Sequence, residues 1–149
     1  MPIRNGARRS ISSRFRFEST QSVNRSIENK GAKLKIVRLY TGSDQKSHFE
    51  EIDMKFGGNQ PMLTTDARAA TSAVFRSAPA GLFLERHPAP RRQFLVSLSG
   101  SWEIEASNGV KRVFKTGDVM LADDTTGEGH TSRALGGEPH VFMTVPLAD

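Results

Sequence analysis

The stretch GLFLERHPAPRRQFLVSLSG, which spans residues 81–100, decides the fold class of this chain. Two short runs inside it, residues 82–87 and 93–98, are rich in the apolar and aromatic residues that favour β-strands. Pro88 and Pro90 lie between the runs and lack the backbone N–H that an interior strand needs. The stretch therefore predicts two short strands joined by a loop, a bulge or a sheet edge.

The chain after residue 33 continues this pattern of short strands. None of its segments shows the long helical period of an amphipathic helix. Glycine, proline and asparagine separate the runs, and such spacing is typical of an all-β sandwich or barrel. The further predicted strands span residues 33–40, 47–54, 71–76, 101–106, 110–114, 119–122 and 141–145.

The sequence WEIEASNGVKRVF, residues 102–114, predicts a β-hairpin. Asn-Gly favours a two-residue type I′ turn, because both central residues of that turn need a positive φ. Such a turn at Asn108-Gly109 would place Ile104 opposite Val113, and Glu105 opposite Arg112. We therefore expect an apolar pair on one face of the hairpin and an ion pair on the other.

Length and composition limit the classes of protein that need to be considered. The chain has 149 residues and no cysteine, which suits one domain and excludes disulfides and thiolate chemistry. No apolar run is long enough to cross a membrane. Residues 1–33 hold eight basic and two acidic residues, so the net charge of +5 comes from this segment. A nucleic-acid partner is not expected, since it would depend on this segment alone.

Residues 1–32 form a basic, serine-rich N-terminal extension, and residues 33–149 form the predicted domain. The composition of the extension predicts disorder or loose attachment, because it offers little apolar surface to bury. An organelle transit peptide and a phosphate-binding arm are the alternatives, and a secretory signal is not expected. The expected localisation is cytoplasmic, with organelle targeting left open.

Residues 81–100 resemble the first motif of the cupin superfamily, which has a glycine, a His-x-His pair, a glutamate and a closing glycine. Residues 117–122, GDVMLA, resemble the start of its second motif, and His130 follows. The resemblance covers about residues 34–149. It implies a small single-domain, RmlC-like cupin, which is a double-stranded β-helix or jelly-roll barrel, and a homodimer.

The resemblance also implies a divalent metal inside the barrel, such as Fe, Mn, Ni or Zn. The family binds it through the two histidines and the glutamate of the first motif and the histidine of the second. His87 matches the first histidine, whereas Ala89 and Gln93 stand where the second histidine and the glutamate are expected. His130 matches the last histidine with a shifted spacing. The candidate metal ligands are therefore His87, Gln93 and His130, without an anionic ligand.

A wider set of polar residues is predicted to line a ligand pocket. Strand alternation would place Glu85 on the same face as His87. Arg92 is either solvated or, like Arg91, able to grip a carboxylate or phosphate. The predicted pocket residues are Glu85, His87, Arg92, Gln93, Asp123, Asp124 and His130.

Each of these residues also has a plainer interpretation. His87 would then be an interior histidine satisfied by Gln93, and His130 a surface residue in a glycine-rich loop. Residues 123–127, DDTTG, would be only a turn. His48 and His140 are expected at a surface or interface, and Trp102 is expected as a core or dimer-interface anchor.

Three functions remain open. The first is a small-molecule-binding module of unknown ligand. The second is a metal-dependent oxygenase or isomerase that uses His87, Gln93 and His130. The third is a metal-free epimerase or isomerase with His87 or His130 as the catalytic base. The sequence has no phosphate-binding loop, dinucleotide fingerprint or nucleophile elbow, and it leaves open whether the protein is an enzyme.

Overall fold

The computed structural model describes residues 31–59 and 61–149, which form ten β-strands and no helix. The predicted extension therefore lies almost wholly outside the described residues. The described part contains no helix that could serve as a membrane span. The strands are β1 (Leu34–Thr41), β2 (Ser47–Met54), β3 (Val74–Ala78), β4 (Phe83–His87), β5 (Gln93–Ser99), β6 (Ser101–Ala106), β7 (Lys111–Lys115), β8 (Val119–Asp123), β9 (His130–Leu135) and β10 (His140–Pro146).

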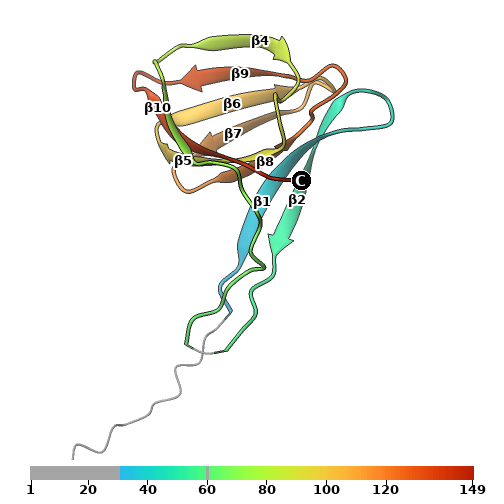
Figure 1. Cartoon of the computed structure of the whole chain (residues 1–149). Coiled ribbons are helices and arrows are strands. Elements are labelled where there is room, and N and C mark those ends of the chain that lie inside the picture. The colour runs from blue at the N-terminus through green and yellow to red at the C-terminus, as the bar shows by residue number, and fades with distance from the viewer. Residues whose placement is uncertain (1–30, 60) are drawn as a thin grey trace, which may run out of the picture.

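The strands form two facing sheets that together make a barrel (Figure 1). The larger sheet has the order β2-β1-β8-β5-β10-β3, and the smaller has the order β4-β9-β6-β7. All pairings are antiparallel except that of β1 with β8. From β3 to β6, and again from β7 to β10, successive strands alternate between the two sheets, as in a double-stranded β-helix. The predicted all-β, jelly-roll fold is confirmed.

The main core lies between the two sheets and follows from alternation along the strands. In β6, Trp102, Ile104 and Ala106 are buried, while the residues between them are partly exposed. Leu39 from the larger sheet and Phe114 from β7 belong to the same core cluster. Each large side chain of this kind stabilises the fold by about 1.5–3 kcal/mol on burial. Trp102 is thus a core residue, as predicted.

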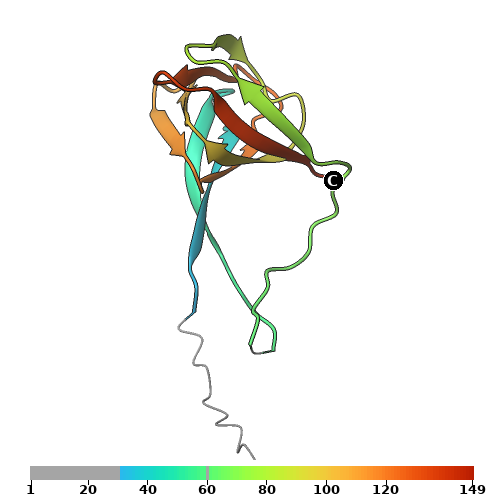
Figure 2. The ribbon, with the colours of Figure 1, turned by 90° about the vertical axis from the view of Figure 1, so that its left-hand side faces the viewer.

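A second, smaller core lies on the outside of the larger sheet. The hairpin of β1 and β2 continues beyond the barrel, and the chain between β2 and β3 leaves with it before returning to the barrel (Figure 2). On its return this chain forms a bridge between Ala70 and Leu147. Leu147 is buried with Ile36 and Leu121. The C-terminal residues are therefore held against the sheet.

The β6–β7 hairpin forms, but its predicted register is wrong by one residue. Ile104 pairs with Arg112, and Glu103 pairs with Val113. Ala106 accepts the backbone N–H of Gly109, and only Gly109 in the turn has a positive φ. The loop therefore has three residues and ends in a glycine bulge, a common alternative to the type I′ turn. The extra residue turns Val113 outward, where it is 43% exposed.

Strand β9 was not predicted from the sequence, which placed His130 in a glycine-rich loop. The segment HTSRAL has few apolar residues and no strong strand signal. It nevertheless lies between β4 and β6, and its Ser132 and Ala134 are buried. Pairing with both neighbours therefore decides the structure of this segment.

His140 is a core residue rather than the expected surface or interface residue. Only 1% of it is exposed. Its ring stacks against Trp102 and Phe142, with centroid distances of 5.2 and 4.9 Å. Its Nε2 lies 3.1 Å from the Ser97 hydroxyl. Burial lowers the pKa of His140 from its ordinary value of 6.5, so the ring is held neutral.

We expect His140 to make the protein less stable as the pH falls below about 6.5, the usual pKa of a histidine in an unfolded chain. Below that pH, His140 binds a proton in the unfolded state but not in the buried site of the native state, so the free energy of unfolding decreases. Urea unfolding at about pH 7.5 and about pH 5.5 measures this loss. His140→Phe keeps the stacking and should reduce the loss. An equal loss in wild type and variant would contradict the assignment.

Candidate functional site

A cavity of about 330 Å³ opens between the two sheets. Its inner wall is largely apolar and includes Leu95, Trp102, Ile104, Met120 and Phe142. Its polar lining includes His87, Gln93 and His130, together with Arg76 and Arg91. A concave, mostly apolar site with a few polar groups is the usual form of a small-molecule pocket.

The two histidines singled out from the sequence lie together at this cavity. His87 ends β4, His130 begins β9, and the two are partners in the strand register. Their ring centroids are 4.8 Å apart. Nδ1 of His87 lies 2.6 Å from the backbone carbonyl of Glu85. A carbonyl only accepts, so Nδ1 donates and the neutral ring carries its lone pair on Nε2.

His130 is oriented in the same way by a buried carboxylate. Its Nδ1 lies 2.6 Å from Oδ2 of Asp124. Asp124 is 0% exposed, and its Oδ1 has no hydrogen-bond partner among the described residues. The carboxylate accepts the Nδ1 proton, so Nε2 of His130 is again the available atom. Such outer partners fix the tautomer and the orientation of functional imidazoles.

Gly129 allows the two histidine-bearing strands to approach. Its φ is +73°, and a Cβ on it would overlap the carbonyl group of His87 and the nitrogen of Pro88. The Ser47 hydroxyl donates a 2.6 Å hydrogen bond to the Gly129 carbonyl. The glycine-rich loop of the sequence is therefore the element that sets the distance between the two imidazoles.

Glu85 does not line the cavity, contrary to the sequence prediction. The register of β4 against β9 shifts between Leu84 and His87. Leu84 and His87 both line the cavity, while Glu85 is exposed. This β-bulge breaks the alternation on which the prediction depended.

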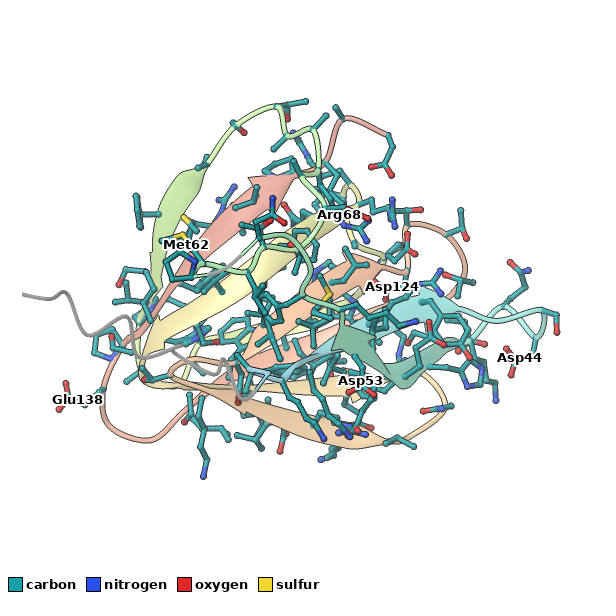
Figure 3. The ribbon with its side chains drawn as sticks, turned by 90° about the horizontal axis from the view of Figure 1, so that it is seen from below. Asp44, Asp53, Met62, Arg68, Asp124 and Glu138 are labelled. Atoms are coloured by element: carbon teal, nitrogen blue, oxygen red, sulfur yellow. The ribbon has the colours of Figure 1, made fainter. Side chains whose placement is uncertain are left out.

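Arg92 and Asp123 also lie outside the cavity lining. Nε of Arg92 lies 3.2 Å from Oδ1 of Asp123, and its Nη1 pairs with Asp149. Asp123 also binds Nη2 of Arg38 at 2.6 Å. Asp123 and Asp124 are consecutive, so one side chain joins the outer ion pairs while the other binds His130. In Figure 3, Asp124 lies among the strands, whereas Asp44 projects from the loop between β1 and β2. Asp124 acts on the cavity only through His130, and does not line it.

Gln93 lines the cavity, and so do two arginines, Arg76 and Arg91. The sequence leaves Arg91 open between solvent and ligand, and its pattern does not indicate Arg76 as a site residue. The signal for Arg76 was available, because it lies two residues after Val74 in β3 and such residues share one face of a strand, here the face toward the cavity. Strand alternation would have identified Arg76 only with the added knowledge that β3 lies at the edge of the cavity.

The resemblance to cupins implies a metal, and the chemistry of the lining residues can be compared with that expectation. The cavity supplies two imidazole nitrogens and the neutral amide of Gln93. Among the described residues no Asp or Glu lines the cavity, and no group of three His, Asp or Glu side chains is placed to hold an ion. A non-haem iron site of this kind usually pairs two histidines with a carboxylate, and the amide of Gln93 carries no charge. These residues therefore do not fit a resident divalent metal.

The strand order and the cavity together define a small jelly-roll barrel with a histidine pair. No family model and no curated protein matches the chain. Solved structures do, and several of them are described as cupin or double-stranded β-helix domains. A Klebsiella pneumoniae protein with a double-stranded β-helix domain is 25% identical, with a TM-score of 0.43 over 54% of this chain and 75% of that one.

Two further similar structures are described as cupins. A cupin 2 barrel protein from Salinispora arenicola is 18% identical, with a TM-score of 0.43 over 61% of this chain and 71% of that one. A cupin domain from Bordetella pertussis is also 18% identical, with a TM-score of 0.43 over 64% of this chain and 99% of that one.

Proposed function

We propose that this protein binds a small organic molecule in its barrel cavity, where Nε2 of His87 and Nε2 of His130 contact the ligand. One observation carries the proposal: both rings have Nδ1 hydrogen-bonded to the protein and line the same cavity. Two fixed lone pairs beside an apolar wall suit a ligand with a polar group on a compact apolar body.

Metal-free acid–base catalysis is the second candidate, and the Asp124–His130 pair favours it. A histidine that donates Nδ1–H to a buried carboxylate is arranged to accept a proton at Nε2. His87, with its ring centroid 4.8 Å away, could return a proton. Incubating a bound ligand in D₂O separates the two candidates, since an epimerase or isomerase incorporates deuterium at carbon and a binding module does not.

The metal-dependent alternative is less well supported by the donor set. In its favour, both histidines donate Nδ1–H to an oxygen of the protein, as metal-binding histidines commonly do. The absence of a carboxylate in the described lining, and the presence of two arginines, oppose a cation there. The chemistry of the lining thus favours a metal-free site.

The predicted homodimer also remains part of the proposal. On the outer face of the larger sheet, the strand register aligns Phe75, Met143, Val96 and Val119 in one row. Phe75 is 71% exposed. A second copy of the chain would bury this row, which gives the homodimer a definite surface.

A fragment library screened by fluorescence and NMR tests the proposed binding site. Trp102 is the only tryptophan of the chain and lines the cavity, so its emission reports a ligand there. We expect any fragment that changes this emission to shift the ring resonances of His87 and His130. His48, which pairs with Asp44 away from the cavity, should not shift. A library without a single saturable response would contradict the proposal.

A further inference from the structure

We infer that the ligand is an organic carboxylate, and that Arg76 and Arg91 bind its carboxylate group at the cavity opening. This inference rests on the proposed function and adds the chemical class of the ligand. Both arginines line the cavity and both are exposed, which places them at its opening. No acidic residue of the described chain shares the lining with them.

Arg76 is held in place by a buried hydroxyl. It lies on the edge strand β3, and its Nε donates to Oγ1 of Thr144 at 3.2 Å. Thr144 is only 2% exposed, so this anchor is rigid. Within the described residues, the two terminal nitrogens of Arg76 have no hydrogen-bond or ion-pair partner. They form a fork suited to the two oxygens of a carboxylate.

Arg91 and the adjacent Arg92 differ in their ion pairing. Arg92 is neutralised by Asp123 and Asp149 on the outer surface. Arg91 lines the cavity, and within the described part of the chain it makes no ion pair. Two neighbouring arginines therefore differ in environment, and the one that faces the cavity lacks a counter-charge.

The remaining lining limits the ligand further. Behind the arginines, the cavity wall is formed by apolar side chains such as Ile104, Met120 and Phe142. Two cations and no anion leave a positive potential, which is strengthened by the low dielectric of the walls. A carboxylate bound at the opening, on a short body that packs against these apolar side chains, matches both features.

Two matched pairs of probes test the inference on the full chain: hexanoate against hexanamide, and glutarate against glutaramide. The members of a pair share shape and differ in charge. We expect saturable changes in Trp102 emission with a carboxylate, and binding at least about tenfold weaker with its amide, since a charge-assisted hydrogen bond exceeds a neutral one by about that factor. Rising salt should weaken carboxylate binding.

Substitutions of Arg76 and Arg91 test whether these two side chains bind the carboxylate. Arg76→Gln and Arg91→Gln should each weaken carboxylate binding about tenfold and leave amide binding unchanged. Thr144→Val keeps the charge but removes its anchor, and should give a smaller loss. Arg133→Gln is the matched control, because Arg133 lies over Phe83 outside the cavity.

The outcomes separate this inference from the proposed function. Equal binding of carboxylates and amides would overturn the inference, while a cavity that binds small molecules would still stand. Carboxylate binding that survives both arginine substitutions, or falls equally in Arg133→Gln, would also overturn it. If no probe changes Trp102 emission, the inference is wrong, and the proposed function is then decided by the fragment screen.

Discussion

Gly129→Ala is expected to destabilise the protein by at least about 3 kcal/mol, because a left-handed φ alone costs a residue with a side chain about 1–2 kcal/mol and an overlap with backbone adds to it. The φ of Gly129 is +73°, and its new Cβ would overlap the carbonyl of His87. This carbonyl belongs to the backbone and cannot move aside like the end of a flexible side chain, so β4 and β9 would have to separate. Urea unfolding measures the loss.

Gly136→Ala is the matched control for this substitution. Gly136 has a φ of +76°, nearly the same as Gly129, but a Cβ there would have no heavy atom within 4 Å. We expect only the conformational cost, about 1–2 kcal/mol. Equal losses in both variants would show that β4 and β9 do not approach as described. The His87 and His130 ring resonances should shift in Gly129→Ala alone.

Trp102→Ala is the second substitution with a large expected effect, a loss of about 3–5 kcal/mol on truncating a buried tryptophan. Trp102 packs against His140 and Phe142, with centroid distances of 5.2 and 6.0 Å, and also lines the cavity. Its removal therefore leaves part of the core unsupported and enlarges the cavity. Denaturant unfolding followed by circular dichroism gives the loss, since the variant has no tryptophan emission.

Val113→Ala serves as the control for the same hairpin. Val113 lies on β7 and faces solvent, so its truncation should change stability by no more than about 0.5 kcal/mol. In the register predicted from sequence, Val113 would instead pair with Ile104 on the buried face. A loss of more than about 1 kcal/mol would favour that register over the one in the structure.

Most strands could be predicted from the sequence, because each is a short apolar run between turn residues. β2 and β6 have the predicted bounds, and the other predicted strands differ by a few residues at their ends. β9 was missed because its residues carry little strand preference, and it is ordered by the neighbours on both sides. Local preference decides the strands that bury large side chains, and sheet pairing decides the rest.

The site was predictable only where it follows from spacing along the chain. His87, Gln93 and His130 line the cavity, as motif spacing indicated. Glu85 was misplaced, because a β-bulge cannot be seen in a pattern that assumes strict alternation. Asp124 was expected as a pocket residue and instead lies buried behind His130.

The sequence alone thus determined the all-β class, the short strands and the histidines that face one another, because these depend on local pattern and spacing. The tertiary structure decided which charges remain without a partner. Arg91 and Arg92 are adjacent and chemically identical, yet only Arg92 meets Asp123 and Asp149. Ion pairs join residues that are far apart in the chain, so only the folded barrel determines which arginine is left to meet a ligand.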